Sequence, residues 1–256
     1  MAIALTSQFL SAPTSHAAQN PCGASGNYHD GYVSTPSTFN YGALARIEYN
    51  NPDLCGADDT SASVSMAWVM IDAESAIHPG DGNAYNWAQV GYYQAGSSSA
   101  WSSGAGIGTF AQWTKKCKAS LTCGSAVPWV TVFDGKNPTG SWEYKVYRSN
   151  SNGHIYMKAD TKNIDVSTFD PFGDWSSGWR VEYAAETFHK QSDVPGTTSD
   201  PTSVDNIKKA DINSTWSFTS KSSLNIGITP GTRYHASTFS PSGGGFGFRV
   251  WTSPLS

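Results

Sequence analysis

Charged side chains are scarce in this chain. They make up 14% of its 256 residues, where about 25% is usual for a soluble domain. The net charge is −4 and no basic stretch occurs, so neither a nucleic acid nor an anionic membrane surface is expected as a partner. No segment holds 18 consecutive apolar residues, and no transmembrane helix is predicted. A chain of this length can still bury a core without the help of a metal ion.

Motifs that bind metals are missing as well. The six histidines are scattered, and the sequence contains no H-E-x-x-H and no C-x-x-C. We therefore expect no metal and no cofactor. The four cysteines are an even set, which favours two disulfides in an exported protein. Cys117 and Cys123 are spaced to close a hairpin loop, and Cys22 and Cys55 would then tie the N-terminal segment to the domain.

The N-terminal 18 residues resemble a signal peptide. A short apolar segment precedes small residues at Ser15, Ala17 and Ala18, which is typical of a signal-peptidase cleavage site. The positive charge that normally begins such a leader is absent, so part of it could be missing, and a disordered tail is the alternative. We expect residues 19–256 to form one secreted, extracellular and monomeric domain.

Long helical patterns are absent, and runs rich in β-branched and aromatic residues dominate. The hairpin predicted around an Asn-Gly turn at 152–153 is the strongest local signal. We predict loops at 96–108, 191–209 and 240–245. Strands without intervening helices indicate an all-β protein, an antiparallel β-sandwich of the jelly-roll kind. The predicted strands are 41–49, 61–71, 87–93, 129–133, 142–148, 154–158, 179–187, 214–219 and 247–251.

Glutamate is rare, and two of the five glutamates share one predicted strand. Side chains alternate along a strand, so Glu182, Ala184 and Glu186 lie on one face. The residues between them are apolar or aromatic and are predicted to face the core. Because a small alanine separates the two carboxylates, we expect their face to be open and to form the floor of a groove.

A second strand divides in the same way. In the segment 87–93, Trp87, Gln89, Gly91 and Tyr93 share the face opposite to three predicted core residues. Gly91 removes bulk beside Gln89. If both strands belong to one concave sheet, Gln89 and Glu186 would point into the same cleft.

These two segments resemble the motifs of a known family. Gln89-Val90-Gly91 is similar to the Q-x-G strand of the glutamic peptidases of the eqolisin type, and Glu182-Tyr183-Ala184-Ala185-Glu186 is similar to their E-W-x-x-E strand. The neprosin-like relatives use two glutamates instead. The resemblance implies a secreted, concanavalin-like jelly roll that cleaves polypeptides in mild acid, with Glu186 as general base and Gln89 as its partner.

Residues around this centre are candidates for binding the substrate, and the sequence departs from the family's pattern in a segment beside one of them. The segment Phe110-Ala111-Gln112-Trp113 carries Gln112 where the family has a glutamate. The candidate substrate-binding residues are Glu182, Trp87, Tyr93 and Trp113.

The sequence is also compatible with other functions. A polar and aromatic face is often only the solvated side of an antiparallel sheet. The same fold could bind carbohydrate without chemistry, on a platform of Trp87, Tyr93, Trp101 and Trp113. A glycoside hydrolase using Glu182 and Glu186 is the third alternative. Its substrate would be a polysaccharide, but the two Cα atoms would lie about 13 Å apart, whereas a retaining pair needs carboxyl groups about 5–5.5 Å apart.

Overall fold

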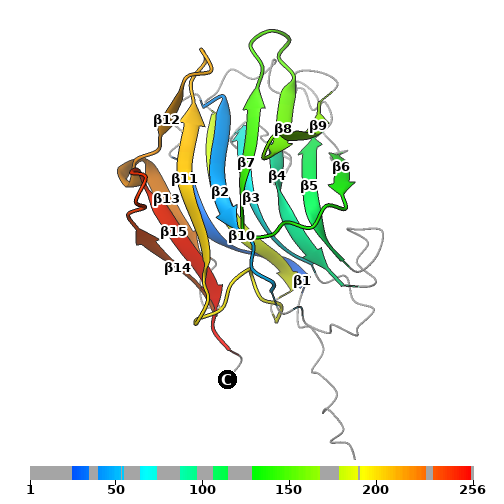
Figure 1. Cartoon of the computed structure of the whole chain (residues 1–256), viewed down its shortest axis with the longest axis vertical. Coiled ribbons are helices and arrows are strands. Elements are labelled where there is room, and N and C mark those ends of the chain that lie inside the picture. The colour runs from blue at the N-terminus through cyan, green and yellow to red at the C-terminus, as the bar shows by residue number, and fades with distance from the viewer. Residues whose placement is uncertain are drawn as a thin grey trace, which may run out of the picture.

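The chain forms a sandwich of two antiparallel sheets (Figure 1). Sheet A has seven strands and sheet B has eight. The computed structural model describes residues 25–34, 40–52, 54, 64–73, 87–96, 106–114, 129–167, 179–189, 191–228 and 233–254. This architecture confirms the predicted all-β, single-domain jelly roll.

Sheet A contains both strands that carry the candidate residues. Its order is β13 (Leu224–Ile228), β1 (Ser25–Ser34), β10 (Trp179–His189), β3 (Val64–Ala73), β4 (Trp87–Ala95), β5 (Gly106–Thr114) and β6 (Trp129–Asp134).

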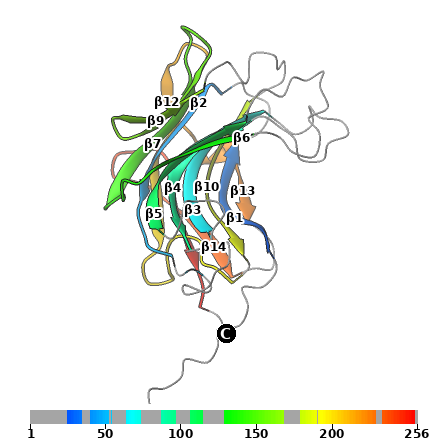
Figure 2. The ribbon, with the colours of Figure 1, turned by 90° about the vertical axis from the view of Figure 1, so that its right-hand side faces the viewer.

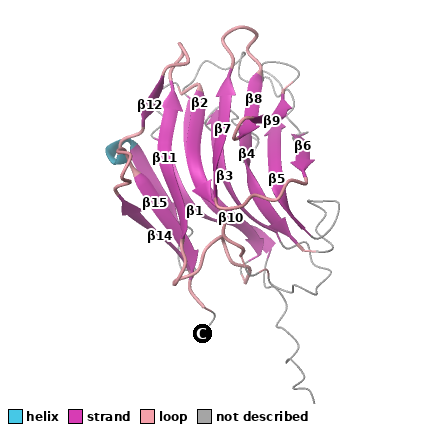
Figure 3. Ribbon diagram, in the orientation of Figure 1, coloured by secondary structure: helices cyan, strands magenta, loops and turns pink. Residues whose placement is uncertain are grey.

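Sheet B packs against one face of sheet A, and a view turned by 90° shows the two layers beside each other (Figure 2). The order of sheet B is β14 (Tyr234–Phe239), β15 (Gly247–Thr252), β11 (Thr202–Ala210), β2 (Gly42–Glu48), β7 (Ser141–Arg148), β8 (Ile155–Ala159) and β9 (Lys162–Val166), and β12 (Trp216–Phe218) pairs with β11. A single turn of 3-10 helix, η2 (Lys221–Ser223), is the one helical element among the described residues (Figure 3).

The space between the sheets is filled by large apolar side chains. Alternate residues of each strand point into it, and Tyr92, Tyr144, Tyr183, Phe248 and Met157 are fully buried there. The same alternation that the sequence predicts for β4 and β10 is observed, because their odd and even positions fall into two separate apolar clusters. The predicted hairpin is also confirmed, since β7 pairs with β8.

Two predicted loops contain strands. The segment 191–209 includes most of β11, which pairs with both β2 and β15. A β-bulge between Asp205 and Lys208 places Asn206 at a positive φ of 52°, and such a bulge breaks the simple alternation that reveals a strand. The segment 96–108 includes the start of β5 at Gly106, where glycines weaken the strand signal. The strands β1, β9, β13 and β14 were not predicted either.

Some expectations fall on residues that the structure does not describe. These are the signal peptide at 1–18, the four cysteines with their two disulfides, and Trp101. They remain predictions. In the described part of the chain, no helix has the length and apolar character needed to cross a membrane.

Candidate functional site

The candidate residues meet on the outer face of sheet A, which points away from sheet B. Strand β3 lies between β10 and β4, and its register places Glu182 beside Met70 and Met70 beside Gln89. The same cross-strand row continues to Gln112 on β5. Glu182 and Gln89 are therefore two strand spacings apart, about 10 Å between Cα atoms.

Glu186 lies on the same face, in a parallel row four residues further along β10. Its row runs through Met66 on β3 to Tyr93 on β4. Glu186 and Gln89 thus share one face of one sheet, as predicted, but Glu182 is the glutamate in register with Gln89. We call this group of Glu182, Glu186, Gln89, Gln112 and Trp68 the glutamate face.

This face is less exposed than the sequence predicts. Glu186 is 9% exposed, Gln89 7% and Trp68 4%. They lie within a second apolar cluster on this side of sheet A, formed by Val64, Met66, Trp68, Met70, Tyr93, Ala95, Phe110 and Ala184. The same burial argues against a fully solvated surface, and the carboxyl group of Glu186 is held in an apolar environment.

Glu186 has one direct partner on this face. The indole Nε1 of Trp68 donates a hydrogen bond of 3.0 Å to its Oε2. Burial raises the pKa of Glu186 to about 7, and the bond from Trp68 opposes that rise. The reason is that desolvation penalises the ionised carboxylate, whereas a donor stabilises it.

Glu182 sits beside a buried ion pair. Arg180 donates two hydrogen bonds to Asp72, of 2.9 and 2.5 Å, and its Nη2 also lies 3.1 Å from Glu182 Oε1. Asp72 is fully buried, whereas the side chain of Glu182 is 18% exposed. Burial, together with the charge and hydrogen bond of Asp72, raises the pKa of Glu182 to about 8, although Arg180 lowers it.

Gln89 belongs to a chain of side-chain amides. Its Nε2 donates to Gln112 Oε1 at 2.8 Å, and Gln112 Nε2 donates to Thr131 Oγ1 at 2.9 Å. Gln112 is therefore the group that orients the Gln89 amide. An amide nitrogen carries two donors, so Gln89 has a second N–H that the bond to Gln112 does not use.

Two glycines keep the centre of the face flat. Gly91 lies opposite Trp68, and a Cβ at Gly91 would collide with Ala67 O and lie 2.8 Å from Trp68 Cα. Gly31 lies opposite Ala184, and its Cβ would come within 2.6 Å of Ala184 Cβ. Glycine at these two positions therefore permits the close approach of β4 to β3 and of β1 to β10.

The aromatic candidates divide between the two faces. Tyr93 lies on the glutamate side, with its ring edge-on to Phe110 and Phe133, and Trp87 packs against the same cluster. Trp113, the remaining candidate for substrate binding, lies on the other side of the sheet. Its side chain is 3% exposed in the core between the sheets, and its Nε1 donates to Asp165 on β9 at 2.7 Å. It cannot form a sugar-binding platform with Trp87 and Tyr93, because it points to the opposite side of sheet A.

No group of three or more metal-ligating side chains occurs among the described residues. Glu182 and Glu186 are the acidic groups of the glutamate face, and Glu182 shares Arg180 as a counter-charge with the neighbouring Asp72. The arrangement offers two carboxyl groups that retain protons to unusually high pH and an amide donor in the same apolar surrounding. Such a set can move a proton to or from a reacting group.

Comparisons with known proteins assign this chain to no family. No family model matches it, and no curated protein is similar in sequence. Three solved structures share part of the arrangement. The first comes from work on endo-acting O-glycanases that prominent members of the human gut microbiota express to initiate mucin breakdown, with 8% identity, a TM-score of 0.36 and coverage of 83% of this chain.

The other two structures are similarly distant. The Crh5 transglycosylase in complex with NAG has 10% identity, a TM-score of 0.35 and coverage of 81% of this chain and 82% of its own. Rv0315, a pseudo β-1,3-glucanase of Mycobacterium tuberculosis, has 13% identity, a TM-score of 0.31 and coverage of 85% and 65%. The chain spans 55% of the length of the O-glycanase structure. Values this low assign no activity to this protein.

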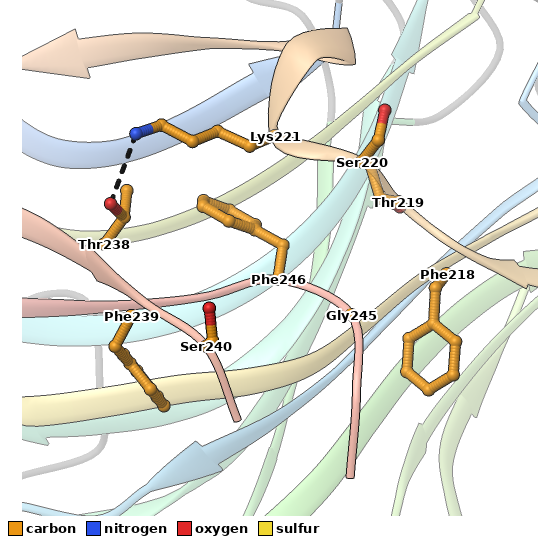
Figure 4. A pocket seen from close by; sticks show the side chains of 9 residues that line it. All are labelled: Phe218, Thr219, Ser220, Lys221, Thr238, Phe239, Ser240, Gly245 and Phe246. Carbon is orange, nitrogen blue, oxygen red and sulfur yellow. Dashed lines mark hydrogen bonds between the residues drawn. The ribbon is translucent and has the colours of Figure 1, made fainter. Parts of the chain in front are cut away.

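Several residues in or beside the glutamate face are not predicted from the sequence. Trp68, Asp72 and Arg180 gave no signal, because an aromatic or charged residue within or beside a strand does not reveal its partner on another strand. A pocket of about 590 Å³ was missed for the same reason. Its walls include Phe239 and Phe246, and Lys221 donates across it to Thr238 Oγ1 at 3.3 Å (Figure 4). None of the glutamate-face residues lines it.

Proposed function

We propose that this protein is a secreted hydrolase whose reacting groups are Glu186, Glu182 and Gln89, and that its substrate is a polypeptide. The observation that carries the proposal is a pair of glutamates on one face of β10, Glu186 buried and Glu182 partly buried, with an amide donor in the cross-strand row of Glu182. Burial raises the pKa of both carboxyl groups, and such shifts concentrate at reacting centres.

The roles follow from the surroundings of each group. Glu186, whose carboxylate accepts the bond from Trp68, is the base that takes a proton from water as the water oxygen bonds to the peptide carbonyl carbon. Gln89 donates its second N–H to the carbonyl oxygen as negative charge develops there. Glu182, which keeps its proton to higher pH, gives that proton to the leaving amine as the C–N bond breaks.

The raised pKa values alter one expectation. Activity requires ionised Glu186 and protonated Glu182, so it should rise and then fall as pH increases. Because burial raises the pKa of both groups, the maximum is expected near neutrality rather than in mild acid. The two groups influence each other, and the profile reports the pair.

A glycoside hydrolase using the same two glutamates is the second candidate. It is favoured by two carboxyl groups of unequal proton affinity on one strand, which is how an acid and its ionised partner are distinguished in glycosidases. The residue between them on this face is Ala184, and the neighbouring amide of Gln89 would have no necessary role. Peptide hydrolysis uses that amide, which is why we place it first.

The experiment compares two substrate classes across four variants. Purified protein is incubated with unfolded proteins and with a panel of neutral polysaccharides between pH 4 and pH 8. Glu186→Gln, Glu182→Gln and Gln89→Ala are the test variants, and Glu143→Gln on sheet B is the matched control. We expect proteolysis that Glu186→Gln and Gln89→Ala reduce at least 100-fold, with the control unchanged.

Each other outcome decides against the peptide assignment. Polysaccharide cleavage that needs both glutamates but survives Gln89→Ala would replace it with the glycoside hydrolase. Proteolysis that is unaffected by Glu186→Gln would remove the glutamate face from the chemistry. Folding of each variant is checked by near-ultraviolet circular dichroism, so that loss of structure is not mistaken for loss of a reacting group.

A further inference from the structure

A group of lysines and aromatic rings lies on the outer face of sheet B. We call it the lysine–aromatic patch. Lys208 on β11, Lys145 on β7 and Lys158 on β8 occupy one cross-strand row, with Leu44 on β2 between the first two. The row extends over three strand spacings, about 14 Å. The members of the patch are Lys145, Lys158, Lys208, Tyr147, Tyr156 and Trp216.

The rings form a neighbouring row. Tyr147 and Tyr156 stack with their centroids 5.4 Å apart, and Trp216 meets Tyr147 edge-on at 6.3 Å. Gly42 makes this possible, because a Cβ there would lie 2.8 Å from the Trp216 ring and 2.9 Å from Tyr147 Cβ. Lys145 lies over two of the rings, 4.9 Å from the centre of Tyr147 and 4.5 Å from that of Trp216.

The three lysines are not balanced by ion pairs with acidic side chains of the described residues. Like charges opposite each other across strands are destabilising, yet within the described part of the chain none of the three forms an ion pair. Glu143, also on β7, is the acidic neighbour, and its carboxylate accepts a hydrogen bond of 3.5 Å from Asn206. Burial and the other two lysines lower the pKa of Lys145, against the pull of Glu143.

We infer that the lysine–aromatic patch binds an acidic polysaccharide, with uronate carboxylates on the lysines and sugar rings against the aromatic side chains. Charge complementarity and the length of the row indicate an extended anion rather than a single small one. A polyuronate carries one charge per sugar. Double-stranded DNA carries one negative charge per about 1.7 Å of its axis. This charge density is too high to match three lysines spread over the row, and a protein with a net charge of −4 would be repelled by it.

Binding of polygalacturonate by the whole protein tests the inference. We expect affinity that falls steeply as salt increases, and little binding of the fully methyl-esterified polymer, whose sugars are the same but uncharged. The variant Lys145→Gln/Lys158→Gln should bind at least tenfold more weakly and depend less on salt. The matched control is Lys136→Gln/Lys221→Gln, which removes equal charge and whose Lys136 also lies over an indole, that of Trp142.

A second measurement does not depend on any variant. Polygalacturonate should protect Lys145 and Lys158 of the unaltered protein from an amine-reactive label, while Lys136 stays reactive. The inference is overturned if the protein does not bind, if both double variants bind alike, or if the two lysines are not protected. Tighter binding of single-stranded nucleic acid than of polygalacturonate would overturn the choice of partner.

Discussion

The indole nitrogen of Trp68 lies 3.0 Å from Oε2 of Glu186, on the neighbouring strand of sheet A. This bond crosses the centre of the glutamate face and is the one direct interaction that lowers the pKa of Glu186 against the effect of burial. It therefore couples the protonation of a buried carboxyl group to a side chain whose ring is otherwise packed in an apolar cluster.

Replacing Trp68 by phenylalanine should make Glu186 a weaker acid. The variant keeps an aromatic ring but removes the N–H donor, and a hydrogen bond to a charged group contributes about 1.5–3 kcal/mol. We expect the pKa of Glu186 to rise by about 1, measured by NMR titration of its labelled carboxyl carbon. Trp216→Phe on sheet B is the control and should leave that titration unchanged. A lower pKa in Trp68→Phe would contradict the role of the indole.

The stability of the protein should decrease from mildly acidic to weakly alkaline pH. In the folded state Glu186 keeps its proton to about pH 7, while in the unfolded chain it loses it near 4.5. Between those values the folded state holds more protons, so the free energy of unfolding falls as pH rises. We expect a loss of about 3 kcal/mol from this group, with a further loss in the same direction from Glu182.

Urea unfolding at pH 4.5, 6 and 8 measures this dependence. The Glu186→Gln variant cannot ionise at that position, so its stability should change less over the same range. Glu143→Gln, outside the glutamate face, should retain the slope of the original protein. Stability that increases between pH 4.5 and pH 7 would show that Glu186 is ionised in the folded state.

Adding one methyl group at Gly91 should disrupt the centre of sheet A. A Cβ there would collide with Ala67 O and lie 2.8 Å from Trp68 Cα, and neither backbone atom can move alone. We expect Gly91→Ala to reduce the free energy of unfolding by about 3 kcal/mol. Gly106→Ala on β5 is the matched control, since nothing lies within 4 Å of its Cβ, and it should change stability by less than about 0.5 kcal/mol. Equal effects of the two substitutions would argue against the close approach.

Two core tyrosines should respond differently to loss of the hydroxyl group. Tyr183 donates a hydrogen bond of 2.7 Å to Lys208 O, whereas the buried hydroxyl of Tyr144 has no hydrogen-bond partner among the described residues. Tyr183→Phe should therefore cost about 1 kcal/mol. Tyr144→Phe removes an unsatisfied polar group and should be neutral or stabilising. Thermal unfolding of both variants measures the difference, and a larger loss for Tyr144→Phe would mean that its hydroxyl is satisfied.

The sequence predicts this fold well where strands alternate regularly and poorly where they do not. The faces of β4 and β10 follow from alternation alone, so Gln89, Glu182 and Glu186 are correctly placed on one side. The bulge at Asn206 interrupts β11 and hides it in an apparent loop. Alternation along β5 also assigns Trp113 to the face opposite Gln112.

The pairing and register of strands that are far apart in the sequence cannot be predicted from the sequence alone. The pairing of Asp72 with Arg180 joins residues 108 positions apart, and the register of β3 against both neighbours decides that Glu182, not Glu186, is level with Gln89. The burial of the glutamate face was missed because a period of two residues distinguishes the sides of a strand but does not say which side water reaches.

Strand β3 is enclosed in every direction. Its residues from Val64 to Asp72 are buried, and it is bonded to β10 on one edge and to β4 on the other. Its amide protons should exchange with solvent only when the entire domain unfolds. Trp68 and Asp72 thus belong to the segment expected to open most slowly. Because they contact Glu186 and Glu182, they hold these two side chains against local fluctuation. Any adjustment to a bound molecule must then come from other parts of the protein.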